Sequence, residues 1–155
     1  MLQKGEKAPD FTLVDTEKKE RKLTDYQGKK VLILFFPMAF TSVCTDELCA
    51  VRDELAYYND LESEVLAISV DSPFTLAKFK QDQNYNFTLL SDWNKEAARS
   101  YGALYEEFVL GLRGVAKRSA FVVDEEGRIQ YAEILENAGQ VPDFIKIKET
   151  LSSLS

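Results

Sequence analysis

The stretch Phe35-Phe36-Pro37-Met38-Ala39-Phe40-Thr41-Ser42-Val43-Cys44-Thr45-Asp46-Glu47-Leu48-Cys49 joins an apolar run to a helical pattern, and a cysteine lies at the junction. The six residues 31–36 are all apolar, with Gly28-Lys29-Lys30 before them and Pro37 after them. Such a run is typical of a strand that is buried on both faces of a parallel sheet. We therefore predict a central strand over residues 31–36.

The residues after Thr45 carry a helical period. Leu48, Val51, Leu55 and Tyr58 are spaced three or four apart, with charged and polar residues between them. This spacing predicts an amphipathic helix from Thr45 to about Asp60. Cys44 is then expected at or near the first turn of that helix.

A sulfur at a helix start has a chemical consequence. Unpaired backbone N–H groups and the positive end of the helix dipole favour an anion, so the thiolate is stabilised over the thiol and Cys44 becomes a nucleophile. Asp46 and Glu47 are expected in the same turn, where they oppose a second negative charge. A compensating cation must come from elsewhere in the chain, and Arg118 is the candidate.

Length and composition limit the classes of function. With 155 residues, 45% of them hydrophobic, the chain predicts one domain over residues 1–155. No apolar leader and no run of about 18 apolar residues is present, so we expect a cytoplasmic protein with no membrane partner. The formal net charge is −7, from 26 acidic and 19 basic residues, and this balance argues against nucleic-acid binding.

The chain contains no histidine and only two cysteines. The absence of histidine excludes Ser-His-Asp and Cys-His catalysis as well as His-ligated metal sites, and two cysteines alone do not form a structural zinc site. We expect no metal and no cofactor. Reactive thiol chemistry remains for the cysteines, and the structural alternative is that both are small buried apolar residues.

The remaining patterns predict an α/β fold. The expected elements are an N-terminal hairpin at a sheet edge (8–15 and 18–23), a strand (65–70), a helix (74–82), a short strand or loop (88–92), a helix stopped by Gly102 (94–101), a loop (104–116), a β-hairpin (119–123 and 128–135) and a last helix from near Pro142 to Leu151. This order resembles the thioredoxin arrangement, which implies three α/β/α layers around a mixed central sheet, with the N-terminal hairpin as an extension. Cys44 would lie just beyond the carboxyl end of a central strand, where α/β proteins place their sites.

The pattern Pro37-x-x-x-Thr41-x-x-Cys44 after an apolar strand resembles the peroxiredoxin signature. Four more segments resemble that family in the same order along the chain: residues 8–13, 67–71, 89–92 and 118–124. The resemblance implies an antioxidant thiol-dependent peroxidase that reduces hydrogen peroxide and organic hydroperoxides.

The resemblance also implies roles for individual residues. Cys44 would be the peroxidatic nucleophile, Thr41 a hydrogen-bonding partner of the thiolate and the peroxide, Pro37 a shield against water and Arg118 the cation beside the sulfur. Glu47 matches an acidic position that recurs in part of the family, which implies a supporting role.

Ionisation alone makes a modest catalyst. Lowering a thiol pKa from about 8.5 to about 6 raises the thiolate fraction at neutral pH only about 10- to 30-fold, and lower nucleophilicity cancels part of this gain. Stabilising the charge that develops on the peroxide oxygens is worth about 2.7–4 kcal/mol per fixed donor. We assign this task to Arg118, the Thr41 hydroxyl and a backbone N–H near Cys44.

The role of Cys49 has two alternatives. Along an intact helix its Cα would lie roughly 8–9 Å from that of Cys44, which is too far for a disulfide. The Cys-x-x-x-x-Cys spacing nevertheless resembles the bacterioferritin-comigratory or Q-type subgroup, in which the second cysteine resolves the sulfenic acid after local unwinding. Residues 36–41 and the loop before Arg118 are more similar to the alkyl hydroperoxide reductase E-type subgroup, which uses one cysteine and an external thiol, and Cys49 would then be structural.

The resemblance also indicates which reductant and which oligomer to expect. The reductant would be thioredoxin, a glutaredoxin- or mycothiol-like thiol or another thiol. With no C-terminal cysteine in the sequence, the two-subunit disulfide of typical two-cysteine peroxiredoxins is not expected, and a homodimer through the loops around the site is expected for an E-type relative.

Two other classes of function compete with the peroxidase. A thiol–disulfide oxidoreductase would carry Cys-x-x-Cys at the helix start, whereas four residues separate Cys44 from Cys49. A thioredoxin-fold redox sensor or binding module would use Cys44 as a switch without fast peroxidase turnover.

Overall fold

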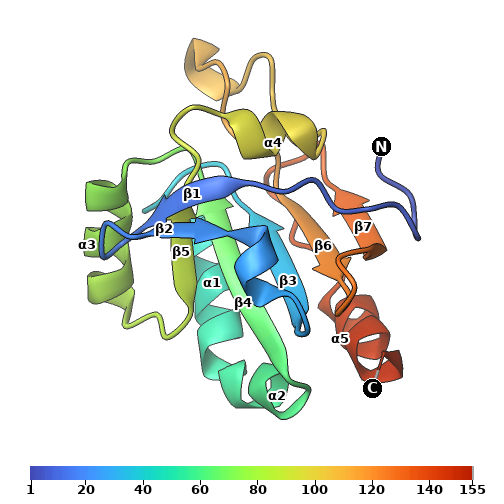
Figure 1. Cartoon of the computed structure of the whole chain (residues 1–155). Coiled ribbons are helices and arrows are strands. Elements are labelled where there is room, and N and C mark those ends of the chain that lie inside the picture. Colours follow the sequence, from blue (N-terminus) through green and yellow to red (C-terminus); the bar gives the residue numbers. More distant parts are fainter. Residues whose placement is uncertain (155) are drawn as a thin grey trace.

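One mixed sheet organises the computed structural model, which describes residues 1–154. Its strand order is β2-β1-β5-β4-β3-β6-β7 (Figure 1). The strands are β1 (Thr12–Asp15), β2 (Glu20–Lys22), β3 (Lys30–Phe35), β4 (Ser63–Ser69), β5 (Thr88–Ser91), β6 (Ser119–Val123) and β7 (Ile129–Ile134). The helices are α1 (Ser42–Asp53), α2 (Leu55–Asp60), α3 (Pro73–Gln83), α4 (Glu96–Ser100) and α5 (Phe144–Ser153), with short 3-10 turns η1 (Leu23–Tyr26) and η2 (Val109–Gly111).

Strand β3 is central, as its unbroken apolar run predicts. All six of its residues are buried. It pairs in parallel with β4 and antiparallel with β6, and this second pairing sets Phe35 opposite Ser119. The carboxyl end of β3 therefore lies beside the amino end of β6.

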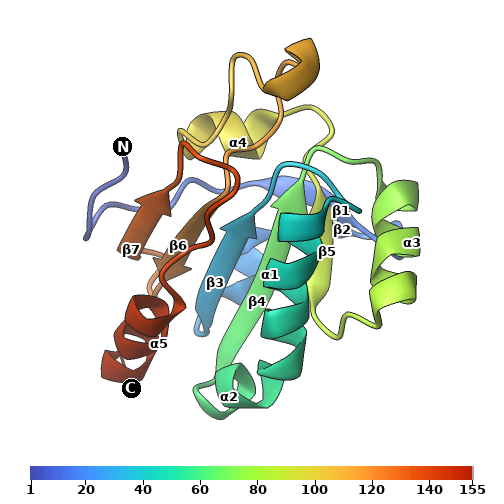
Figure 2. The same cartoon turned by 180° about the vertical axis from the view of Figure 1, so that it is seen from behind.

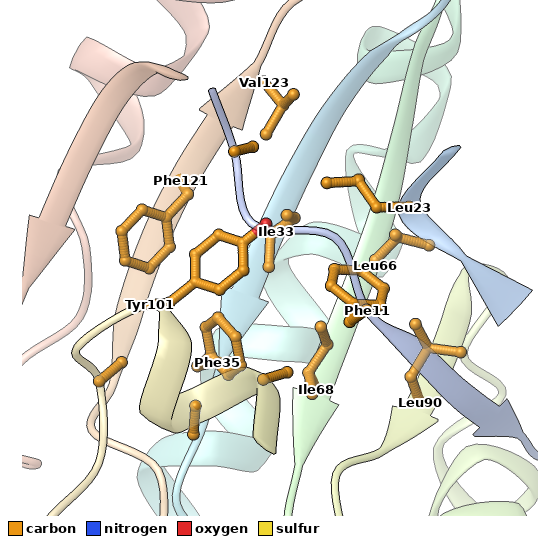
Figure 3. Packing of buried hydrophobic residues seen from close by; sticks show 14 of the residues in the cluster. Phe11, Leu23, Ile33, Phe35, Leu66, Ile68, Leu90, Tyr101, Phe121 and Val123 are labelled. Atoms are coloured by element: carbon orange, nitrogen blue, oxygen red, sulfur yellow. The ribbon is translucent and has the colours of Figure 1, made fainter. Parts of the chain in front are cut away.

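Two apolar cores cover the two faces of the sheet, which confirms the predicted three layers. On one face, side chains from β3, β4, β5 and β6 pack against α4, η1 and the N-terminal segment (Figure 3). Tyr101 is fully buried there, its ring 5.5 Å from that of Phe35 and 5.0 Å from that of Phe121. Its hydroxyl donates to the Pro9 carbonyl at 2.7 Å, and this bond ties the N-terminal segment to the core.

The other face is covered by α1, α2, α3 and α5 (Figure 2). The predicted stripe on the first helix faces this core: Leu48, Val51 and Tyr58 are buried, and Leu55 is half-buried against them. Cys44 belongs to the same cluster and has no exposed surface.

The helix predicted over 45–60 differs from the structure in two ways. It begins at Ser42, because Thr41 has the extended backbone of an N-cap residue, with φ −82° and ψ 149°. It is also divided into α1 and α2 at Glu54, whose N–H donates to the Ala50 and Val51 carbonyls. Asp46 and Glu47 therefore lie beyond the first turn, so their predicted place in it was wrong.

The other predicted helices and strands are present, and their ends differ from the predicted ones by a few residues. The N-terminal hairpin joins the sheet edge as predicted, with β1 antiparallel to β5. Residues 88–91 form a strand rather than a loop. The last helix begins at Phe144, two residues after Pro142, because the Asp143 side chain accepts the Lys146 N–H at 3.1 Å and caps it.

The predicted loop 104–116 contains the short turn η2, and an isolated bridge between Leu104 and Ala116 closes its base. It rises past α4 at the top of the molecule (Figure 1). Its tip is apolar and open to solvent, with Leu110 93% exposed. Across residues 1–154, the helices are all too short or too polar to traverse a bilayer.

Candidate active site

The start of α1 presents backbone N–H groups beside Cys44 that no carbonyl of the helix accepts. Cys44 is the third residue of the helix, which confirms its predicted place in the first turn. The first helical hydrogen bond runs from the Thr45 N–H to the Thr41 carbonyl at 2.9 Å. The N–H groups of residues 42–44 precede it and so have no acceptor within the helix, which favours negative charge at this end.

The Thr41 hydroxyl is turned away from the sulfur. It donates to the Met38 carbonyl at 2.8 Å, and its side chain makes no capping hydrogen bond to the helix. A hydroxyl has one proton to donate, so in this conformer Thr41 does not donate to Cys44. Pro37 is buried directly after β3, where it ends the strand.

The turn 37–41 is held in place from β4. The Asp71 carboxylate accepts the Ala39 N–H at 2.8 Å and the Ser69 hydroxyl at 2.7 Å. Phe40 occupies the left-handed region at φ 69°, which costs roughly 1–3 kcal/mol, and its ring lies 4.9 Å from that of Phe79. Asp71 thereby anchors the turn that leads to Cys44, a role that no sequence pattern indicated.

Arg118 reaches the sulfur directly. Its Nη2 donates to Cys44 Sγ at 3.0 Å, and the two residues are 1% and 0% exposed. They are 74 positions apart in the chain, and the pairing of β3 with β6 brings them together because Arg118 immediately precedes β6. The predicted juxtaposition of cation and sulfur is present in the structure.

Two further acceptors fix the guanidinium. Arg118 Nε and Nη2 donate to the Ala138 carbonyl at 3.2 and 3.1 Å, and Nη1 pairs with Glu47 Oε1 at 3.5 Å. Ala138 lies in the loop between β7 and α5. The sequence carried no signal for this contact, because a backbone carbonyl can come from any residue type.

Glu47 is an enclosed carboxyl rather than a surface acid of the first turn. Its side chain is 0% exposed, and within residues 1–154 its Oε2 has no hydrogen-bond partner. Burial raises the pKa of Glu47 to about 7, against the opposing pull of the Arg118 guanidinium. The neighbouring Asp46 is exposed to solvent.

Cys49 lies on the same unbroken helix as Cys44, and both thiols are free. Its sulfur is 3.6 Å from Gln83 Oε1 and 3.7 Å from Tyr85 Oη, and it is half-buried at the edge of the helical core. The two cysteines are five positions apart on an intact helix, so their sulfurs do not bond in this conformation.

The comparisons with known proteins agree with this geometry. A family model described as the AhpC/TSA family matches residues 4–132. The chain belongs to this family of peroxiredoxins. The peroxiredoxin is 41% identical over 153 residues to a putative peroxiredoxin of Mycobacterium tuberculosis, covering 97% of this chain and 96% of the relative.

One further relative and one solved structure are also similar to the peroxiredoxin over its full length. Alkyl hydroperoxide reductase E of Mycobacterium bovis is 39% identical over 158 residues, covering 100% of this chain and 99% of that protein. The crystal structure of peroxidoxin BcpB from Mycobacterium tuberculosis superposes with a TM-score of 0.88 at 26% identity, covering 100% and 99% of the two chains. The predicted fold, family and thiol-dependent peroxidase activity are confirmed, and the roles of single residues remain predictions.

The buried carboxyl should make the peroxiredoxin's stability depend on pH. Its folded pKa of about 7 lies above the ordinary value of 4.5, so between these values the native state holds more protons than the unfolded state. Stability therefore falls as pH rises through this window, by up to about 3 kcal/mol. Glu47→Gln should remove this fall.

Urea unfolding of the reduced protein at about pH 5 and about pH 8 measures the effect. The matched control is Asp46→Asn, which removes an exposed carboxylate one residue away and should keep the wild-type pH dependence. An equal loss of stability with pH in wild type and Glu47→Gln would refute the assignment.

Proposed function

We propose that Cys44 is the peroxidatic nucleophile of this peroxiredoxin and that Arg118 is the cation that activates it. The observation that supports this most directly is the 3.0 Å contact between Arg118 Nη2 and Cys44 Sγ in a site closed to water. A buried guanidinium beside the sulfur favours the thiolate, which is the form that attacks peroxides.

The reaction follows from the chemistry of a thiolate and an O–O bond. A sulfur lone pair attacks one peroxide oxygen in line, the O–O bond breaks with its electron pair on the other oxygen, and that oxygen leaves as water or alcohol after taking a proton. Cys44 becomes a sulfenic acid, Cys–SOH. The substrates would be hydrogen peroxide and organic hydroperoxides.

The donors around the sulfur would stabilise the charge that moves onto the peroxide oxygens. Arg118 supplies N–H groups, and the free N–H groups of residues 42–44 point out of the helix start. If the Thr41 side chain rotated about its Cα–Cβ bond, its hydroxyl would leave the Met38 carbonyl. It would then donate to the thiolate or to the peroxide. Pro37, buried beside the turn, would keep water away from the sulfur.

The sulfenic acid must then be reduced. We propose that Cys49 resolves it to a disulfide after the first turns of α1 unwind, and that a thioredoxin-like protein or a small thiol restores both thiols. The half-buried position of Cys49 supports this, because its sulfur is not locked inside the core. Two free thiols suit a reducing compartment such as the cytoplasm.

Replacing Arg118 tests the activation. Arg118→Ala should lower the second-order rate constant of Cys44 oxidation by about 10²- to 10³-fold, because a lost donor to the transition state adds to any loss of thiolate. Stopped-flow kinetics give the rate, and ultraviolet absorbance of the thiolate gives its fraction. Arg118→Lys, which keeps the charge but not the planar fork, is the matched comparison. A rate that drops only as far as the thiolate fraction would remove the proposed role in the transition state.

Mass spectrometry after one equivalent of peroxide tests the resolution step. Oxidation should remove two hydrogens from the wild-type chain as the Cys44–Cys49 disulfide forms, whereas Cys49→Ser should hold one added oxygen as the sulfenic acid. A persistent sulfenic acid in the wild-type chain would instead assign reduction to an external thiol and leave Cys49 a structural residue.

Apolar side chains around the site support a homodimer. Three large apolar side chains are exposed at this end of the molecule. They are Phe40 after β3 (50% exposed), Trp93 after β5 (61%) and Leu110 at the tip of the loop before β6 (93%). We propose that these loops meet their counterparts in a second copy of the chain, since apolar surface of this extent favours association.

Sedimentation velocity tests the dimer. Leu110→Glu should shift the wild-type dimer toward monomer, because it places a charge in the proposed contact. The control is Ile145→Glu, a residue that is 72% exposed on α5, and this helix lies at the far end of the molecule from the loop 104–116 (Figure 1). Wild-type protein that sediments as a monomer would disprove the interface.

A further inference from the structure

Three ionisable groups share one enclosed site. Cys44, Glu47 and Arg118 are 0%, 3% and 1% exposed, and the guanidinium contacts both of the others. The site holds one permanent cation and two acids that compete for it. The inference below rests on the proposed role of Cys44 as the reacting thiol.

The charge count limits which groups ionise together. If both acids were ionised, the enclosed site would carry a net charge of −1, and a buried charge without a partner is strongly disfavoured. Glu47 Oε2 would be the oxygen left bare, because among residues 1–154 it has no hydrogen-bond partner. A single proton shared by the two acids makes the site neutral.

The contacts indicate which acid keeps that proton. Arg118 Nη2 lies 3.0 Å from the sulfur, whereas its Nη1 lies 3.5 Å from Glu47 Oε1, at the outer limit of a hydrogen bond. Sulfur is the larger atom, so the shorter distance marks the closer contact. The cation is therefore better placed to balance a thiolate than a carboxylate.

We propose that Glu47 holds the proton that Cys44 gives up, and that it releases this proton when Cys44 is oxidised, so that the enclosed site stays neutral through the peroxide step. Glu47 is a positioning residue for charge in this scheme, since it acts through Arg118 and does not touch the peroxide.

The peroxide reaction then needs no proton from solvent. Before the reaction the site holds a thiolate, a carboxylic acid and the guanidinium, and ROOH enters. The thiolate attacks, the O–O bond breaks, and the sulfur becomes the neutral sulfenic acid. Arg118 then has only Glu47 as its anion, so the carboxyl ionises and its proton balances the leaving RO⁻, which departs as ROH. The products are Cys–SOH, a carboxylate and ROH.

The surroundings support this titration. Glu47 contacts Arg118 from the start of β6, Cys44 lies one turn earlier on the same helix, and the loop between β7 and α5 contributes the uncharged Ala138 carbonyl to the guanidinium. Two tyrosines also interact with the site, Tyr85 with Cys44 and Tyr105 with Arg118, and both are neutral near pH 7 because burial raises their pKa further above the ordinary value of 10. Burial raises the pKa of Glu47 to about 7, so its proton is held near neutrality. Loss of a thiolate that contacts the same guanidinium would leave Arg118 to the carboxyl alone and so make this proton easier to release.

Counting protons in a single turnover tests the proposal. Reduced protein in the Cys49→Ser background is mixed with one equivalent of hydrogen peroxide in weak buffer with a pH indicator, at a pH where thiolate absorbance shows Cys44 to be ionised. This Cys49→Ser parent should take up almost no proton from solution, because Glu47 provides the proton that the leaving oxygen needs. Adding Glu47→Gln, which has no proton to release, should raise the uptake by about one proton per Cys44.

The pH profile of the oxidation rate gives a second readout. The rate constant of the parent should decline by up to about tenfold per pH unit above about 7, as Glu47 loses its proton, whereas that of Glu47→Gln should stay level. Asp46→Asn should match the parent in both measurements. A merely structural Glu47 would lower the rate equally at every pH and leave the proton count unchanged.

Each outcome bears on the proposal. Equal proton uptake in the parent and in Glu47→Gln would overturn it, as would parallel pH profiles. If Glu47→Gln does not fold, the Cys49→Ser parent gives the answer by itself: uptake of about one proton with ionised Cys44 below about pH 7 contradicts the release of a proton from Glu47 on oxidation. A parent that does not react with peroxide at all would instead refute the proposed function.

Discussion

The site depends on one buried cation. A guanidinium removed from water must find acceptors for its N–H groups, or the fold loses several kcal/mol. Arg118 finds three acceptors on two elements: the sulfur and, one turn further along, a carboxyl on α1, and a carbonyl in the loop before α5. The cation therefore fixes the loop and the first turns of the helix relative to the sheet. The contacts that stabilise the fold are thus the ones that we propose activate the sulfur.

The sheet makes this meeting possible. Strand β3 ends at the turn that leads into α1, and the antiparallel pairing with β6 brings the start of that strand to the same edge. Asp71, after β4, holds the turn from the other side through the Ala39 N–H. The neighbours of β3 on both sides thus supply the groups that place Cys44, and all of them emerge at the same edge of the sheet.

The sequence predicted the parts of this site that periodicity and residue type encode. An apolar run bounded by Pro37 identified the central strand, and helical spacing placed Cys44 at a helix start. It could not place the helix start to the residue, because the extended backbone of Thr41 is set by tertiary contacts, and so Glu47 was assigned to the wrong turn. The Ala138 carbonyl and the hydroxyl contact of Thr41 are backbone geometry, which side-chain patterns do not report.

The proposed mechanism places two conflicting requirements on helix α1. Intact, it presents its N–H groups to the sulfur and keeps Cys44 and Cys49 too far apart to bond. Resolution by Cys49 requires its first turns to open, so their local stability must be low enough to allow it. In the proposed cycle, oxidation itself changes that stability, because the sulfenic acid is neutral and Arg118 then pairs with Glu47, one turn further along the helix. The first turn of the helix would thus be held most firmly while the sulfur is a thiolate and less firmly once peroxide has been consumed. The order of the chemical steps follows from the charge on one atom.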